Sequence, residues 1–269
     1  MSEYKEEIDK MQWSYSRLTT FGQCKYEFYL NYILHDKELY PPESNYYSEV
    51  GSFIHEILAK VLNGEITLDE AAQYYVNNFD SQVTHKVQQS IMDKTFELCA
   101  DYFATVDFDW LKDYEILGVE KEVKFQVEDY NFIGYIDMLL RDKRDGKIVV
   151  VDHKSGKYPF KLDGMTVKAN MKHSFESYKK QMYLYCRAVK EEFGEFPKEM
   201  SWNFFKDNAQ IATIPFSKKE YNVAMKWLIN SIHEIEGETD YDAALDYFYC
   251  NNLCNFRYNC EYCQAAEWK

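Results

Sequence analysis

The chain has 269 residues, of which 46% are hydrophobic and 17% aromatic, so it can bury a large core. Its formal net charge of −14 argues against a protein whose whole surface attracts nucleic acid, because contact with phosphates needs positive potential. The sequence has no apolar run of about 18 residues and no apolar signal-peptide centre near its start, so we expect a cytoplasmic protein that does not enter a membrane.

The first part of the chain is predicted to be helical. The first fifteen or so residues have the pattern of a loosely held arm, after which Ser16 can cap a helix with apolar residues every three to four positions. A second helix is expected to begin near Ser48, and His55 lies beside its apolar stripe. Further helix is predicted to about residue 105.

The apolar periodicity then changes from about four residues to two, which indicates strands. Residues 117–127 and 132–142 are predicted to form strands joined by a tight turn, and a loop that ends in Gly146 leads to the next strand. The run 148–151 is continuously β-branched, so we expect it to form a central strand that is buried on both faces.

The rest of the predicted core alternates helix and strand. A helix is expected from about Ser174, followed by short strands at 201–206 and 210–216. Ser217 and Glu220 have the spacing of a capping box that opens a last long helix. This order of elements predicts an α/β core with helical additions.

Two aspartates and a lysine lie on strands that are predicted to be neighbours. Asp152 and Lys154 are two residues apart on one strand and therefore project from the same face, and Asp137 lies on the preceding strand. Carboxylates on adjacent strands make an oxygen-rich site that suits Mg²⁺ or Mn²⁺. A lysine beside them can orient or deprotonate water, or stabilise the charge of a reacting phosphate. Metal-assisted hydrolysis of a phosphodiester needs these parts.

Four motifs follow one another along the chain: Gly51-Ser52-Phe53-Ile54-His55, Gly134-Tyr135-Ile136-Asp137, Val151-Asp152-His153-Lys154 and Gln181-Met182-Tyr183-Leu184-Tyr185. Their order and spacing resemble the PD-(D/E)XK nuclease superfamily and, within it, the RecB-like branch that includes the CRISPR adaptation nuclease and phage exonucleases. The resemblance implies one restriction-endonuclease-like domain over residues 1–269, with a mixed central sheet flanked by helices.

The same resemblance implies roles for individual residues. It implies that His55, Asp137 and Asp152 hold the divalent metal together with the backbone carbonyl of His153. Lys154 matches the catalytic lysine of the family. The second acid is Asp152 here, where many relatives have glutamate, and both occur in the superfamily.

Two further positions complete the implied site. Gln181 and Tyr185 match the Gln-x-x-x-Tyr motif of the branch, which implies that they orient the lysine and contact DNA. Either Glu120 or Glu122 could add an acid from the first strand, and the motif does not decide between them.

Seven cysteines in a reducing compartment indicate buried thiols, catalysis or metal binding. Cys99 and Cys186 lie on apolar helical stripes and are predicted to be core thiols. Four more cysteines lie within fourteen residues near the C-terminus, a density that suggests Zn²⁺ or an iron–sulfur cluster. Spacing alone allows a zinc site built from Cys250, Cys254, Cys260 and Cys263.

The family resemblance favours a [4Fe-4S] cluster instead of zinc. RecB-like nucleases that carry a cluster place one cysteine near the N-terminus and three near the C-terminus. The implied ligands are therefore Cys24, Cys250, Cys254 and Cys260. Cys263 is then a spare thiol or a substitute for Cys260. The Cys24 region and the tail 245–269 would together form a lobe that clamps the two ends of the chain.

These features predict a metal-dependent deoxyribonuclease, and most simply an exonuclease that acts on single-stranded DNA or on DNA ends. The segment 154–180 holds seven lysines against two acidic residues, a local charge of +5 that is expected to follow the DNA backbone. Repair, recombination, phage replication and CRISPR adaptation all use this architecture, so the pathway, its protein partners and oligomer formation stay open.

Two other classes of protein compete with this prediction. One is a non-catalytic iron–sulfur subunit for DNA binding or assembly, which the intact Asp137, Asp152 and Lys154 argue against. The other is a zinc-ribbon interaction module attached to an unrelated α/β body.

Overall fold

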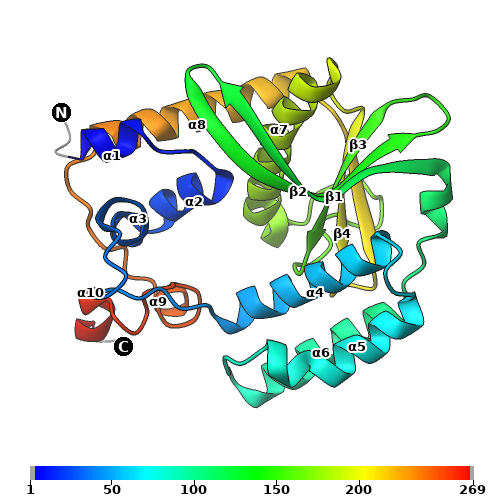
Figure 1. The fold of residues 1–269 in the computed structure, drawn as a ribbon, viewed down its shortest axis with the longest axis horizontal. Coiled ribbons are helices and arrows are strands. Elements are labelled where there is room, and N and C mark those ends of the chain that lie inside the picture. The colour runs from blue at the N-terminus through cyan, green and yellow to red at the C-terminus, as the bar shows by residue number, and fades with distance from the viewer. Residues whose placement is uncertain (1–3, 267–269) are drawn as a thin grey trace.

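A computed structural model describes residues 4–266 and shows a five-stranded mixed sheet with helices on both sides (Figure 1). The strands lie in the order β1 (Tyr114–Val127), β2 (Tyr130–Asp142), β3 (Ile148–Lys154), β4 (Glu199–Phe204) and β5 (Gln210–Pro215). β3 and β4 are parallel, and the other neighbours are antiparallel. The predicted α/β class with a mixed sheet is confirmed.

β3 occupies the centre of the sheet, as its apolar run predicts. Every residue from Ile148 to His153 is buried. On one face the sheet packs against α7 (Lys172–Phe193) and α8 (Lys218–Gly237), which contribute Met182 and Leu228 to the main core. On the other face a smaller cluster forms around Met138 and Val149.

A layer of three helices lies beside this second face (Figure 1). It consists of α4 (Tyr46–Leu62), α5 (Leu68–Gln82) and α6 (Gln89–Thr105), with a short 3₁₀ helix at Asp109–Asp113 leading to β1. α4 begins two residues before the predicted Ser48, because Asn45 and Ser48 cap it reciprocally. Cys99 in this layer and Cys186 on α7 are fully buried, as expected of core thiols.

The N-terminal segment differs from the loosely held arm that the sequence predicts. It folds as α1 (Lys5–Asp9), α2 (Tyr15–Gln23) and α3 (Lys25–Tyr29), and a π turn at Leu30–Leu34 follows. Ile8 and Trp13 are buried, and the backbone of Trp13 donates to Asn131 (2.8 Å) and accepts from Ile133 (2.9 Å). Trp13 makes this contact through its backbone, which leaves no pattern in the side chains, so the sequence does not indicate it.

Two predicted helix caps are also corrected in part. Ser14 rather than Ser16 caps α2, since its side chain accepts from the backbone N–H of Arg17 at 3.3 Å. Ser217 caps α8 as predicted, but the Glu220 carboxylate accepts hydrogen bonds from Lys179 and Tyr183 (3.2 Å each).

The remaining elements are a 3₁₀ turn at Ala169–Met171 and two short helices near the C-terminus, α9 (Tyr247–Asn252) and α10 (Glu261–Ala265). α9 and α10 lie beside α3, so the C-terminal tail meets the region around Cys24 (Figure 1). Across residues 4–266, every helix is too short or too polar to cross a lipid bilayer.

Candidate active site

Two buried carboxylates lie side by side where β2 and β3 separate. Met138 pairs with Val151 in the antiparallel ladder, so Asp137 and Asp152 face each other at its end. Both are buried, with exposed fractions of 7% and 2%. The backbone N–H of His153 donates to Asp137 Oδ2 at 2.6 Å, which fixes that carboxylate against β3. The hairpin therefore brings together the two acids that the motifs single out.

A third carboxylate, that of Glu120 on β1, reaches the pair through an unusual backbone conformation. The register of β1 and β2 on either side of Glu120 places this residue opposite Asp137. Its φ is +46°, in the left-handed region that non-glycine residues seldom occupy. Glu122, the other acid that the sequence left open, instead accepts from the hydroxyl of Tyr135 at 2.9 Å on the exposed side of the sheet. The geometry thus favours Glu120 over Glu122.

His55 on α4 completes a group of three ligand atoms. Its Nδ1 lies 3.1 Å from Glu120 Oε1 and 3.6 Å from Asp137 Oδ1. One ligand atom from each of these three residues lies within 4.8 Å of the other two. Within the described part of the chain, no other three His, Cys, Asp or Glu residues gather as closely. A nitrogen and several carboxylate oxygens suit Mn²⁺ or Mg²⁺.

Lys154 stands on the other side of the carboxylates, at the end of β3. Its Nζ lies 2.8 Å from Asp152 Oδ2 and donates to Gln181 Oε1 at 2.9 Å. Gln181 in turn donates from Nε2 to the hydroxyl of Tyr185 at 3.1 Å. The ring of Tyr178 lies 5.2 Å from the ammonium group. α7 therefore holds the lysine in place with residues from three of its turns.

The charges of this group shift one another's protonation. Burial and the neighbouring carboxylate of Asp152 raise the pKa of Asp137. Burial opposes the charged form of His55, but its hydrogen bond with Glu120 and the charge of Asp137 outweigh burial and raise its pKa to about 8. Burial likewise opposes the charge of Lys154, yet the two aspartates keep its pKa above the ordinary value. Three carboxylates gathered here favour a bound cation.

A set of polar side chains that no sequence pattern indicates supports His153. The amide of Asn203 on β4 donates to His153 Nδ1 (3.1 Å) and lies 2.7 Å from the hydroxyl of Tyr102 on α6. Burial lowers the pKa of His153 to about 3, so the ring is neutral. This ring meets the ring of His55 edge to face, with centroids 5.7 Å apart. These hydrogen bonds fix the position of His153, whose backbone carbonyl the family resemblance assigns to the metal.

Gly134 has a packing reason to lack a side chain. A Cβ at this position would lie 2.7 Å from Cε1 of Tyr185, closer than real Cβ contacts allow. The glycine of the Gly-x-x-Asp motif therefore makes room for the ring of the Gln-x-x-x-Tyr motif. Two motifs that lie far apart in sequence are parts of one contact.

The lysine-rich segment 154–180 does not form one continuous basic track. Lys179 pairs with Glu220, and Lys180 lies 4.2 Å from the ring of Trp227. Tertiary contacts therefore occupy these two side chains, and the path of DNA along the segment stays a prediction. Three lysines of the segment stay exposed and have no acidic partner within 4.0 Å in the described residues: Lys157, Lys161 and Lys172.

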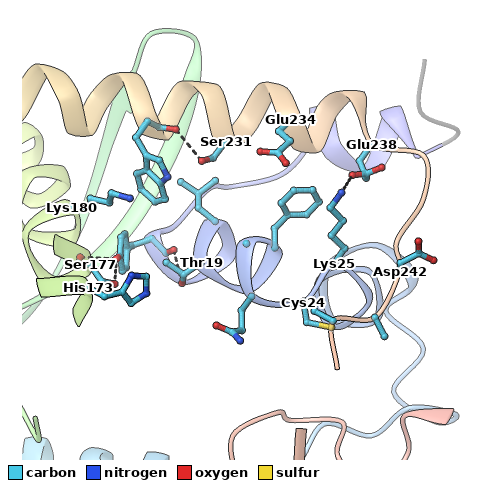
Figure 2. A pocket seen from close by; sticks show the side chains of 18 of the residues that line it. Thr19, Cys24, Lys25, His173, Ser177, Lys180, Ser231, Glu234, Glu238 and Asp242 are labelled. Carbon is cyan, nitrogen blue, oxygen red and sulfur yellow. Dashed lines mark hydrogen bonds and ion pairs between the residues drawn. The ribbon is translucent and has the colours of Figure 1, made fainter. Parts of the chain in front are cut away.

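A groove of about 830 Å³ lies between α2, α7, α8 and the segment after α8 (Figure 2). At one end the hydroxyl of Tyr15 donates to the carbonyl of Ser177 (2.7 Å), and at the other end lies Cys24. Lys25 is paired with Glu238 across it. One wall of the groove, formed by α8 and the segment after it, carries four acidic residues: Glu234, Glu238, Asp240 and Asp242. Their negative charge makes the groove unsuited to a phosphate backbone.

Five cysteines gather where the two ends of the chain meet. They are Cys24, Cys250, Cys254, Cys260 and Cys263. All are buried free thiols that line one small cavity with Leu30 and Phe256. Burial raises the pKa of the four thiols in the tail. The structure thus places Cys263 in the same cavity as the four residues that the family resemblance selects.

Thiolates are ligands for both metal centres that the sequence allows, a zinc ion and an iron–sulfur cluster. A single Zn²⁺ with four thiolates at about 2.3 Å needs sulfur atoms within about 4 Å of one another. A cluster in which each thiolate binds its own iron would hold the sulfurs farther apart.

Polar contacts also join the ends of the chain around this cavity. The buried carboxylate of Glu27 accepts from the backbone N–H of Asn255 (3.1 Å) and from the hydroxyl of Tyr249. Tyr26 donates to Glu261 at 3.1 Å. The contacts between α3 and the tail therefore do not depend on a metal alone.

Comparisons with known proteins agree with this geometry. The sequence model of the PD-(D/E)XK nuclease superfamily matches residues 12–268. The crystal structure of a candidate exonuclease from Eubacterium rectale matches with a TM-score of 0.53 and 14% sequence identity, and the match covers 99% of this chain and 92% of the other. At this identity the likeness shows a shared fold. A search of curated proteins found no match.

The contact between Gly134 and Tyr185 predicts the effect of one methyl group. Gly134→Ala should displace the ring, loosen Gln181 and Lys154, and slow nuclease activity on the order of 10²-fold, as small misplacements in active sites do. The matched control is Gly237→Ala, where an added Cβ meets nothing within 4 Å. Initial rates and thermal unfolding of both variants test this. Equal rates in the two variants would contradict the proposed contact.

Proposed function

Because the chain belongs to the PD-(D/E)XK nuclease superfamily, we propose that it is a divalent-metal-dependent deoxyribonuclease of the RecB-like branch. The observation that carries this proposal is the group formed by His55, Glu120 and Asp137, with ligand atoms within 4.8 Å of one another. Lys154 lies beside this group, next to Asp152. Phosphodiester hydrolysis needs this combination of a cation site and a nearby positive charge.

The proposed metal ligands fit Mg²⁺ or Mn²⁺. His55, Glu120 and Asp137 would hold the ion, together with Asp152 and the carbonyl of His153. When bound, the ion supplies a Lewis acid and lowers the pKa of a coordinated water molecule. The buried side chains of Asp137 and Asp152 exclude competing solvent from the carboxylate face.

Lys154 acts by charge and hydrogen bonding in this proposal. In the metal-free protein the neighbouring carboxylates keep its pKa above the ordinary value. A protonated lysine at this place stabilises the charge that develops on the phosphate. Gln181 holds the ammonium group, and Tyr185 holds Gln181. These two residues position the lysine.

We propose a [4Fe-4S] cluster as the second metal centre, held by Cys24, Cys250, Cys254 and Cys260 with Cys263 available in the same cavity. The cluster would stabilise the lobe in which both ends of one single domain meet, because a site that exists only in the folded state contributes its binding energy to folding. Electron transfer is not required for this role.

The substrate in this proposal is single-stranded DNA or a DNA end, degraded as by an exonuclease. The name of the Eubacterium rectale protein supports that assignment. A cytoplasmic role in repair, recombination, phage replication or CRISPR adaptation, with protein partners or as an oligomer, is consistent with such an activity. A non-catalytic iron–sulfur subunit remains the competing proposal, and activity assays separate the two.

The catalytic role of Lys154 is tested by Lys154→Met, which keeps most of the side-chain volume and removes the charge. Mn²⁺-dependent degradation of linear single-stranded DNA should fall on the order of 10²-fold or more even at saturating Mn²⁺. Thermal stability should fall in the metal-free protein, because the variant leaves the buried carboxylate of Asp152 without its cation, and bound Mn²⁺ should restore part of it. Lys157→Ala, which changes an exposed lysine of the same segment, serves as the matched control. Unchanged activity in Lys154→Met would rule out this mechanism.

The cluster is tested by iron content in anaerobically purified protein. The wild type should be brown, with absorbance at about 400 nm, whereas a zinc protein is colourless. Cys24→Ala should lose iron and thermal stability, and Cys186→Ala should keep iron because Cys186 lies in the main core. Full iron content in Cys24→Ala would show that the tail cysteines alone hold the metal.

A further inference from the structure

The segment that joins β3 to α7 folds into a small hairpin, which we call the 160–167 hairpin. Phe160 and Val167 form an isolated antiparallel bridge. Lys161 and Thr166 are linked by a backbone hydrogen bond of 2.8 Å, and the turn between them is closed at Gly164, which has φ +67°. The carboxylate of Asp163 accepts the backbone N–H groups at the end of the turn (2.8 and 3.0 Å). The turn therefore has a defined conformation.

The base of the 160–167 hairpin is anchored in the protein. Phe160 is buried and meets the rings of Tyr158 and Phe175 edge to face, with centroids 5.7 and 5.1 Å away. The backbone N–H of Tyr158 donates to Asp207 at 2.8 Å, and Lys168 Nζ donates to the carbonyl of Tyr158 at 2.9 Å. These contacts tie the hairpin to the start of α7 and to the end of β4, close to the strand that ends at Lys154.

The tip of the hairpin presents two apolar side chains to solvent. Leu162 is fully exposed and Met165 is 84% exposed, and these are the highest exposures among the large apolar residues of 4–266. An isolated apolar side chain on a surface is ordinary, but two of them on one ordered turn form a small protruding contact surface. A buried anchor that holds apolar groups outward is suited to insertion into a partner.

The flanks of the tip are basic, and the carboxylate of the one acidic residue in the turn, Asp163, accepts backbone N–H groups of the turn. Lys161 lies on the hairpin itself, and Lys157 and Lys172 lie on either side of it along the chain. All three are exposed and have no acidic partner within 4.0 Å in the described residues. The protein as a whole is strongly acidic, with a net charge of −14. Apolar tips with basic flanks complement the bases and phosphates of nucleic acid.

We propose that the 160–167 hairpin is a wedge that inserts Leu162 and Met165 at the end of a DNA duplex and separates the terminal base pairs. Lys157, Lys161 and Lys172 would hold the flanking phosphates. Because the hairpin begins just after β3, the separated strand would lie next to Lys154. This inference rests on the proposed nuclease function and narrows its substrate to the end of a DNA duplex.

Unpairing can be measured without cleavage. A blunt duplex carries 2-aminopurine at its terminal pair or at an internal pair, and the protein is titrated in EDTA so that hydrolysis is absent. Fluorescence of the terminal probe should rise on binding, and that of the internal probe should not. The double variant L162S/M165S should reduce the terminal signal about tenfold, since it removes the apolar contacts that offset unstacking. L39S/V223S, which changes two exposed apolar residues elsewhere, should match the wild type.

Cleavage with Mn²⁺ then separates this inference from the proposed function. We expect L162S/M165S to degrade single-stranded DNA at the wild-type rate and blunt duplex about tenfold more slowly. Terminal unpairing by a wild-type protein that cleaves no DNA would support the wedge and refute the nuclease. Equal unpairing by L162S/M165S and wild type, or no binding to duplex ends by either, would overturn the wedge and leave the tip as a contact for protein.

Discussion

Two carboxylates buried next to each other, those of Asp137 and Asp152, set the conditions for the rest of the site. Taking one charged group out of water costs on the order of several kcal/mol, and two like charges also repel. The fold answers with groups that favour the charged form. The N–H of His153 donates to Asp137, and the ammonium of Lys154 lies 2.8 Å from Asp152. A bound cation would complete this compensation.

The elements around the sheet can be understood as supports for these charges. α4 delivers His55 to the metal side, and β1 delivers Glu120 to the same place. α7 covers the other side and holds Lys154 through Gln181. The proposed second metal centre would be separate in place and chemistry, because the buried thiols that would hold it gather where the Cys24 region meets the C-terminal tail. Oxygen ligands serve hydrolysis in this account, and thiolates serve folding.

Sequence periodicity predicts the strands of the sheet, because the continuous β-branched run before Asp152 is typical of a central strand that is buried on both faces. It also placed the two acids and the lysine together. Glu120 could not be chosen over Glu122, because strand alternation puts both on one face and only the left-handed backbone at Glu120 separates them. Trp13 was missed because it pairs with β2 through its backbone, which leaves no pattern in the side chains.

The number of free lysines in segment 154–180 could not be predicted for a different reason. Counting lysines in segment 154–180 treats each as free, but Lys179 pairs with Glu220, which is distant in the sequence. Only the tertiary fold shows which cations stay available for a phosphate backbone. The same applies to Asn203, whose role depends on its position next to His153 across a parallel strand pair.

If Glu120, His55 and Asp137 form one divalent-cation site, each of them contributes to Mn²⁺ affinity, which calorimetric titration of the metal-free protein measures. Glu120→Gln should weaken binding about tenfold or more, because it removes a charged ligand. Glu122→Gln should bind as the wild type does, because its carboxylate points to solvent and to Tyr135. Equal Mn²⁺ affinity in wild type and Glu120→Gln would contradict the account.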